Sequence, residues 1–271
     1  MKNISLLTRL DDFGASYAAN IAIAELVAAG EFIKNVSCMA VGPHIEEGAH
    51  LIKNCKHICV GMHATLNAEW DLIKWPPISP VDDIPTLVTD KRVFYSDPSS
   101  FVVNRPDIGQ ILLEYDRQLD LLTNLGLDIC YVDSHMLPER YVDGLSEAMS
   151  DWAKRKGLID HIHYYRFPSQ QMPKMASSFE EQYKNVTAWL ESLEEGGYFF
   201  VMHPAKYSRE LILCANKDFP AGMVAVERDV EYRLLLSHKL EHVCNGLGID
   251  SIRYDEAELQ PEMFTEGEKD E

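Results

Sequence analysis

Apolar runs of strand length alternate with amphipathic segments of helix length about seven times along this chain of 271 residues. Such alternation is typical of parallel strands joined by crossover helices, because two consecutive parallel strands need a connection long enough to hold a helix. No dinucleotide fingerprint, Walker A loop or short internal repeat interrupts the order. The pattern and the length favour a (β/α) barrel or a near-closed variant, with a doubly wound open sheet as the alternative.

Turn residues and glycines set the expected boundaries of these elements. The expected strands occupy residues 4–12, 35–41, 57–63, 128–133, 159–167, 198–202 and 249–254. The expected helices occupy residues 20–29, 43–54, 106–125, 139–156, 179–193 and 228–245. We therefore expect a single catalytic domain over residues 1–258, with a long loop insertion at 64–105 and an acidic tail at 259–271.

Charge and composition narrow the class of protein. The formal net charge of −18 repels phosphate backbones and anionic membranes, so we expect neither nucleic acid nor a membrane as a partner. No apolar run approaches the ~18 residues of a membrane span, and no signal peptide is recognisable. We interpret the cysteines as reduced core thiols of a cytoplasmic protein, because no Cys-x-x-Cys pair occurs among residues 38, 55, 59, 130, 214 and 244.

Ionisable residues stand where five of the seven expected strands end. In a parallel βα protein these ends meet at one rim, which is where the active sites of such folds lie. The residues concerned are Asp11 and Asp12 after the first strand, His63 after the third, Asp133, Ser134 and His135 after the fourth, Arg166 in the fifth, and His203 and Pro204 after the sixth.

Two adjacent carboxylates, Asp11 and Asp12, close the first strand. Neighbouring side chains on extended backbone point to opposite sides, so one carboxylate can bind a metal while the other faces a substrate. The alternative is that one of them caps the N-terminus of the following helix.

An aspartate with two histidines is an incomplete cage for a divalent metal, with positions left for water and substrate. A second carboxylate can then take a proton from water, and a further histidine can protonate a leaving amine. The residues thus suit metal-assisted hydrolysis of an amide. Asp133 is a candidate hydrogen-bond partner of His135. Plainer alternatives are a strand-end histidine bonded to a carbonyl for His63, and a simple His-Pro turn for His203.

The motifs, in their order, resemble those of the YdjC-like carbohydrate deacetylases, of which chitooligosaccharide deacetylase is the best-known member. The similarity extends from about residue 3 to 256 and is carried by Leu10-Asp11-Asp12-Phe13-Gly14, Asn20, Gly61-Met62-His63-Ala64-Thr65-Leu66, Asp133-Ser134-His135, His203-Pro204 and Arg228-Asp229-Val230-Glu231-Tyr232. The resemblance implies a distorted (β/α) barrel of the NodB/YdjC-like kind, a homodimer, and removal of N-acetyl groups from amino sugars or short oligosaccharides.

The resemblance also assigns roles. It implies one divalent cation, with magnesium or zinc favoured, bound by Asp12, His63 and His135. Asp11 becomes the general base and His203 the general acid. The remaining assignment is Arg166, which orients Asp11 or holds the substrate.

The chain departs from the family pattern after the Asp-Ser-His motif, where Met136 and Leu137 stand in place of a His-x-His continuation. A contact made by that continuation is therefore missing or is supplied by another residue. Ala205 likewise stands where the family favours glycine. Hydrolysis of an ester or phosphate, or non-catalytic binding of metal and sugar, are the alternative functions.

The remaining histidines and tryptophans have plainer interpretations. We expect His238 and His242, four residues apart, to lie on the solvated face of one helix, and His161 and His163 to be structural. Trp70 and Trp75 in the insertion either stack on a sugar beneath a lid or attach the loop to the barrel.

Overall fold

A computed structural model describes residues 3–163 and 172–258 of the chain. In this part of the chain, every strand pairing is parallel and the sheet has the order β5-β4-β3-β2-β1-β6, with β7 also paired to β1. The strands are β1 (Ile4–Phe13), β2 (Asn35–Cys38), β3 (Cys59–Ala64), β4 (Ile129–Ser134), β5 (Ile159–Asp160), β6 (Gly196–Met202) and β7 (Ile249–Ile252).

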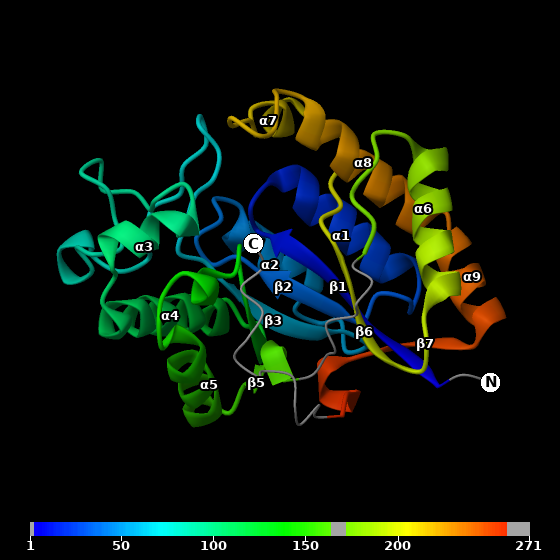
Figure 1. Cartoon of the computed structure of the whole chain (residues 1–271), viewed down its shortest axis with the longest axis horizontal. Helices are drawn as coiled ribbons and strands as arrows, with labels where there is room; N and C mark the ends of the chain where they lie inside the picture. The colour runs from blue at the N-terminus through cyan, green and yellow to red at the C-terminus, as the bar shows by residue number, and fades with distance from the viewer. Residues whose placement is uncertain (1–2, 164–171, 259–271) are drawn as a thin grey trace.

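Helices cover the outside of this curled sheet. In Figure 1 the strands lie at the centre, with α4 and α5 towards one side and α6, α8 and α9 towards the other. The helices are α1 (Tyr17–Ala29), α2 (Ile45–Ile52), α3 (Phe101–Asn104), α4 (Ile108–Asn124), α5 (Leu145–Lys156), α6 (Phe179–Ser192), α7 (Arg209–Ile212), α8 (Met223–Leu236) and α9 (Lys239–Leu247). The predicted distorted (β/α) barrel is confirmed.

Strand β1 is the central strand because it pairs with three others. Its residues Ile4–Leu10 pair with β6 on one edge, and on the other edge its first half pairs with β7 and its second half with β2. Asn35 joins the two strands that share this edge: its amide donates to the carbonyls of Thr8 and Ile252 and accepts from the N–H of Tyr254. The buried amide thus satisfies the backbone groups where β7 ends and β2 begins.

The inner face of β1 changes from apolar to charged along the strand. Alternate residues of a strand share a face, so Leu7, Arg9 and Asp11 point to the same side. Leu7 packs in a small cluster with Tyr131 and Tyr254. Arg9 and Asp11 come next and are also buried. The interior of the sheet is therefore apolar near Leu7, and it is charged at Arg9 and Asp11, closer to the carboxyl ends of the strands.

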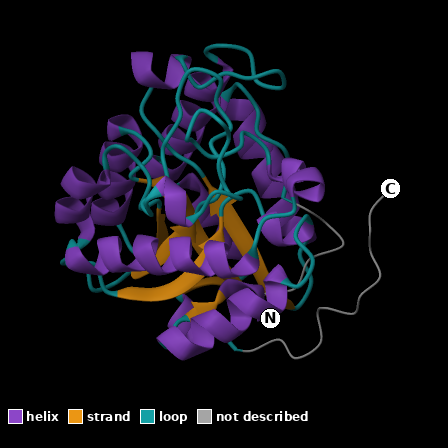
Figure 2. Cartoon of the chain, turned by 90° about the vertical axis from the view of Figure 1, so that its left-hand side faces the viewer, coloured by secondary structure: helices purple, strands orange, loops and turns teal. Residues whose placement is uncertain are grey.

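The insertion after β3 is held against the barrel by polar side chains of α4. Gln118 accepts from the N–H of Thr65 and donates to its carbonyl, and Glu114 accepts from the N–H groups of Ile78 and Ser79. Because Gln118 and Glu114 are both fully buried, these bonds satisfy backbone groups that would otherwise lose water without replacement. Figure 2 shows loops gathered beyond one end of the strands.

Three predicted elements differ clearly from the structure. The helix expected over 139–156 begins only at Leu145, after a 3₁₀ turn at Pro138–Arg140. The helix expected over 228–245 is two helices, α8 and α9, because the chain turns at His238, whose φ is 57°. His238 precedes α9, so it does not share a helix face with His242. The fifth strand ends at Asp160 and is followed by a 3₁₀ turn at His161–His163, while residues 164–167 lie outside the described ranges.

Two further findings concern membranes and thiols. Within residues 3–163 and 172–258, we find no helix with both the length and the apolar character required for crossing a bilayer.

All six cysteines are free, in agreement with the prediction of reduced thiols. Cys55 and Cys130 are only partly buried, so the prediction of core thiols is wrong for these two.

A substitution at Gly61 tests how closely the barrel interior is packed. A Cβ at this position would lie 2.3 Å from the ring of Tyr131, which stacks on Tyr254 at 4.0 Å between centroids and is hydrogen-bonded to Ser37. We expect Gly61→Ala to lower the free energy of unfolding by about 1–3 kcal/mol, because the ring has no room to move. The measurement is urea unfolding followed by circular dichroism.

The control for this prediction is Gly246→Ala, in helix α9, where a Cβ would meet nothing within 4 Å. This variant should be as stable as the parent or slightly more so, since alanine favours helix. Equal stability of both variants would show that the interior around Tyr131 is not closely packed.

Candidate active site

The carboxyl end of β1 is not regular extended backbone. The pairing with β2 shifts between Leu10 and Phe13, and Asp12 has a φ of 63°. This bulge turns both carboxylates towards one histidine: Asp11 Oδ2 lies 4.0 Å and Asp12 Oδ1 3.6 Å from His63 Nε2. The expectation that the two side chains point to opposite sides is therefore wrong, because it assumed extended backbone at both residues.

The turn after the bulge is fixed by the side chain of Asn20 from helix α1. Gly14, with a φ of 102°, donates its N–H to Asn20 Oδ1 at 2.7 Å, and Asn20 Nδ2 donates to the carbonyl of His44 at 2.8 Å. Ser16 caps α1 by accepting from the N–H of Ala19. The alternative in which an aspartate caps this helix is wrong, and both carboxylates are left for the site.

Three of the predicted residues converge on one point. Asp12 Oδ1 lies 3.6 Å from His63 Nε2 and 3.7 Å from His135 Nδ1, and these two nitrogens lie 3.2 Å apart. All three side chains are buried. Asp12 Oδ1 has no hydrogen-bond partner, although a buried carboxylate oxygen normally has one. Asp12, His63 and His135 thus form a candidate metal-binding group.

The distances suit a small divalent cation. Such ions bind nitrogen and oxygen at about 2.0–2.2 Å, which separates neighbouring ligand atoms by roughly 3.0–3.5 Å in tetrahedral or octahedral geometry. The observed separations need only small adjustments to reach these values. A cation would also satisfy Asp12 Oδ1, so the residues present fit a metal.

A second group that could hold a metal consists of Asp11, His63 and Asp133. Three of its four carboxylate oxygens already have a cationic partner, because Arg9 binds both oxygens of Asp11, at 2.7 and 2.8 Å, and Asp133 Oδ2 at 2.8 Å. A metal there would compete with a buried guanidinium. We therefore favour the group that contains Asp12.

Each of the two histidines has a carboxylate on its far nitrogen. Asp133 Oδ1 lies 3.2 Å from His63 Nδ1, and Glu69 Oε2 lies 3.1 Å from His135 Nε2. The prediction that Asp133 serves His135 is wrong, since Asp133 contacts His63 instead. Burial disfavours a charged His63, but the nearby carboxylates of Asp133, Asp11 and Asp12 outweigh it and raise the pKa of His63 to about 9.

Two arginines neutralise the paired aspartates. Burial alone would lower the pKa of Arg9, but Asp11 and Asp133 raise it well above the usual value. Arg228 Nη1 binds Asp12 Oδ2 at 2.7 Å. Burial disfavours the Asp12 carboxylate, yet Arg228 and the neighbouring histidines hold the pKa of Asp12 well below its usual range. The Asp12 carboxylate is therefore ionised and able to bind a cation.

The other two predicted residues are placed differently. His203 Nε2 lies 4.0 Å from Asp11 Oδ2, and the His203 side chain is 42% exposed. Its backbone N–H donates to Glu231 Oε2 at 2.8 Å, which fixes the residue at the end of β6. Arg166 lies outside the described residues, so its predicted role stays a prediction.

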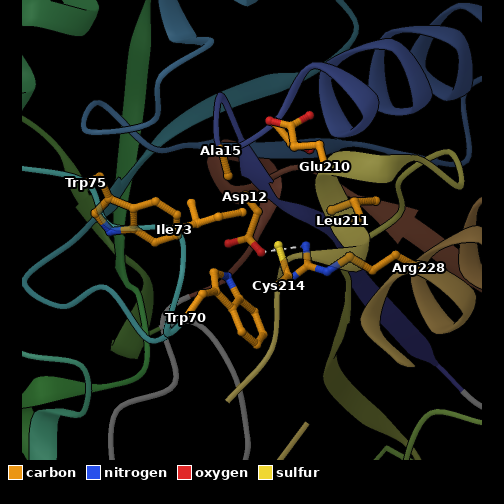
Figure 3. Close-up of a pocket in the computed structure, with 10 residues that line it drawn as sticks. Asp12, Ala15, Trp70, Ile73, Trp75, Glu210, Leu211, Cys214 and Arg228 are labelled. Atoms are coloured by element: carbon orange, nitrogen blue, oxygen red, sulfur yellow. Dashed lines mark ion pairs between the residues drawn. The ribbon is translucent and has the colours of Figure 1, made fainter. Parts of the chain in front are cut away.

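A pocket opens beside Asp12, between the insertion after β3 and the segment that contains α7 (Figure 3). Trp70, Ile73 and Trp75 form one side, and Glu210, Leu211, Cys214 and Arg228 lie across from them. Trp75 is buried and donates its indole N–H to the carbonyl of Asn67 at 2.8 Å. Trp75 also packs edge-on against His135, with ring centroids 6.4 Å apart, so it attaches the insertion to the rim of the barrel as well as lining the pocket.

Comparison with known proteins identifies the family. A family model described as YdjC-like protein matches residues 5–246. The chain belongs to the YdjC-like family.

One curated relative of this YdjC-like protein is named carbohydrate deacetylase, from Thermoanaerobacter pseudethanolicus (strain ATCC 33223 / 39E). It is 25% identical over 248 residues, which cover 85% of this chain and 90% of the relative. The predicted family is thus confirmed over nearly the whole chain.

Two solved structures share the fold. A protein from Enterococcus faecalis V583, described as a cellobiose-phosphate cleavage protein, has a TM-score of 0.73 and 18% identity, covering 94% of this chain and 98% of its own. The catalytic domain of a peptidoglycan N-acetylglucosamine deacetylase from Eubacterium rectale ATCC 33656 has a TM-score of 0.53 and 9% identity, covering 98% and 95%. At such identities the likeness concerns the fold alone.

Sequence reasoning missed the partners of the predicted residues. Arg9 carries a usable signal, because a lone cation inside a buried apolar strand needs an anionic partner. Arg228 belongs to a motif of the YdjC-like resemblance but had no role assigned. Glu69 has no such signal, since its contact with His135 depends on how the insertion folds.

Arg9→Met tests the importance of the buried ion pairs. It leaves Asp11 and Asp133 without their shared cation, so we expect a loss of about 3–5 kcal/mol in the free energy of unfolding. The control Arg92→Met breaks an ion pair with Asp82 at the surface, where the two side chains are 61% and 83% exposed. This variant should lower the free energy of unfolding by less than about 1 kcal/mol. Similar losses in both variants, measured by urea unfolding, would contradict the account.

Proposed function

We propose that this YdjC-like protein is a metal-dependent carbohydrate N-deacetylase that acts on acetylated amino sugars or short oligosaccharides. The observation that carries the proposal is the convergence of Asp12, His63 and His135, with Asp11 and His203 beside them. The family and the curated relative named carbohydrate deacetylase support the reaction class.

Asp12, His63 and His135 would hold the cation through Oδ1, Nε2 and Nδ1. Magnesium and zinc are the favoured ions, because one carboxylate and two imidazoles suit several divalent metals. When bound, the ion supplies Lewis-acid activation of water and of the acetyl carbonyl. Arg228 keeps Asp12 ionised and oriented through its contact with Oδ2.

Asp11 is the proposed general base. Its carboxylate faces His63 and is held by the two parallel hydrogen bonds from Arg9. A carboxylate has about four lone-pair positions, so the arginine leaves room for a proton from the attacking water. The bidentate contact also fixes the direction in which the free lone pairs point. Asp11 can therefore accept a proton without losing its position.

His203 is the proposed general acid, which donates a proton to the departing amine nitrogen. It lies beside Asp11, with 4.0 Å between His203 Nε2 and Asp11 Oδ2. The exposed fraction of its side chain, 42%, leaves the imidazole accessible to a substrate. A base and an acid on neighbouring strands suit a reaction that takes a proton from water and returns one to nitrogen.

The tryptophans suit a sugar substrate. Trp70 and Trp75 line the pocket beside Asp12. Aromatic side chains present an apolar face with few degrees of freedom, against which the C–H face of a sugar ring can pack. The polar groups around the pocket then bind the hydroxyl and amide groups of the ring.

Asp11→Asn is the direct test of the proposed reaction. We expect the rate of acetate release to fall by about 10²–10⁴-fold, because the amide cannot take a proton, while metal affinity stays close to that of the parent. The assay uses metal-loaded protein with N-acetylglucosamine, diacetylchitobiose, longer chitooligosaccharides and their 6-phosphates. The control Asp71→Asn removes the same charge from an exposed position of the insertion and should leave the rate unchanged.

An Asp11→Asn variant as active as the parent would show that another group is the base. Release of acetate from esters, or of phosphate, without any from the amides would show a different metallohydrolase. Binding of metal and sugar without turnover would show a non-catalytic member of the family.

A further inference from the structure

Glu69 contacts the candidate metal centre without belonging to it. Its Oε2 lies 3.1 Å from His135 Nε2, and both side chains are more than nine-tenths buried. The residue comes from the insertion after β3, whereas His135 follows β4. The contact is therefore between two segments far apart in sequence, and a buried carboxylate has been placed against the outer nitrogen of a proposed metal ligand.

The protonation of the histidine follows from its partners. A carboxylate only accepts hydrogen bonds, so the nitrogen of His135 that faces Glu69 must carry the proton. That leaves the lone pair of Nδ1 free, directed towards Asp12 Oδ1 and His63 Nε2. At His63 the nitrogens are exchanged, because Asp133 Oδ1 lies 3.2 Å from Nδ1. When a metal is bound and both imidazoles are neutral, the two carboxylates therefore favour opposite tautomers, and the lone pairs of His135 Nδ1 and His63 Nε2 are directed to one place.

Contacts between two loops hold Glu69 in position. The carbonyl of Glu69 accepts from Asn216 Nδ2 at 3.3 Å, and the N–H of Asp71 donates to the carbonyl of Ala215 at 2.9 Å. Between them, Trp70 packs edge-on against Phe219, with ring centroids 6.0 Å apart. The segment 215–219 therefore supports the part of the insertion that carries Glu69.

The two residues that follow His135 in sequence offer no such group. Met136 and Leu137 follow His135 with φ values of 56° and 52°, and their side chains have neither nitrogen nor oxygen. Both are the residues that replace the His-x-His continuation of the family pattern. Among the described residues, Glu69 is the charged group that contacts His135 Nε2.

We infer that Glu69 is a positioning residue that fixes the tautomer and orientation of His135 and thereby sets the affinity of the metal site. The inference rests on the metal site of the proposed function, and it concerns metal binding whether or not acetate is released. Carboxylate partners of metal-binding histidines raise ligand basicity and hold the ring in place, and losing one typically costs about 10–100-fold in affinity.

The experiment measures zinc(II) binding by calorimetry in three variants of the whole chain. Glu69→Ala removes both charge and acceptor and should weaken binding by about 10–100-fold. Glu69→Gln keeps the shape and one acceptor oxygen, so its loss should be smaller. Circular dichroism verifies that each variant is folded, and Glu69→Gln preserves the test if the alanine variant is not.

Glu210→Gln is the matched control. Glu210 lines the same pocket and its Oε1 lies 3.1 Å from His44 Nε2, so the variant removes an equal charge near the site without touching His135. The change in zinc affinity should be less than about threefold, because solvent screens a half-exposed charge. A loss as large as that of Glu69→Ala would show that only the overall charge matters, and would overturn the inference.

The second readout is the ¹⁵N spectrum of the imidazole of His135. In the metal-free parent, at a pH where the imidazole is neutral, the proton should lie mainly on Nε2, and in metal-free Glu69→Ala it should be shared between the two nitrogens. Parent-like zinc affinity and an unchanged tautomer in the Glu69 variants would overturn the inference. Because neither readout involves a sugar, a protein that fails to release acetate tests the proposed function separately.

Discussion

The contact on which the site depends is the buried pairing of Arg9 with Asp11 and Asp133. One guanidinium binds a carboxylate from each of two strands that are not neighbours, β1 and β4, across the interior of the curled sheet. Tyr254 and Phe199 enclose it, through a hydrogen bond and a cation–π contact. Burying three charges is costly, and it is tolerated here because every charge has a close partner of opposite sign.

This pairing positions the groups above it. Asp133 is fixed by Arg9 and Ser37 and, in turn, faces His63 Nδ1. Asp11 is held in a single orientation beside the bulge that turns Asp12 towards the two histidines. The contacts among Arg9, Asp11 and Asp133 thus fix the directions of the carboxylate and imidazole lone pairs at the carboxyl ends of the strands. A cation bound by Asp12, His63 and His135 would complete this arrangement, since it would give Asp12 Oδ1 the partner that it lacks.

The sequence was sufficient to predict the barrel and the residues at its rim. Parallel strands bring their carboxyl ends to one edge whatever their exact length, so the ionisable residues could be placed at one rim from the strand endings. The choice of Asp12, His63 and His135 among them came from the family resemblance. The side-chain directions could not be predicted, because the bulge at Asp11 and Asp12 depends on the pairing of β1 with β2. His238 shows the same limit: the periodic pattern of residues 228–245 continues through a left-handed residue that breaks the helix.

Contacts made by loops could not be predicted from the sequence either. The partner of His135 is Glu69, from an insertion whose path is set by buried bonds to Gln118 and Glu114 and by the segment around Asn216. Asp133 was the nearer candidate in sequence, yet it faces His63, because alternate residues on neighbouring strands point into the same interior. Nearness along the chain was a poor guide where two strands and a loop meet.

The central claim is that one cation is bound by Asp12, His63 and His135. Anomalous diffraction from crystals grown with zinc(II) or manganese(II) tests this most directly. The account predicts one strong peak about 2.0–2.2 Å from Asp12 Oδ1, His63 Nε2 and His135 Nδ1, with Arg9 still paired to Asp11. A peak among Asp11, His63 and Asp133 with Arg9 displaced, or the absence of a peak in the barrel at saturating metal, would contradict it.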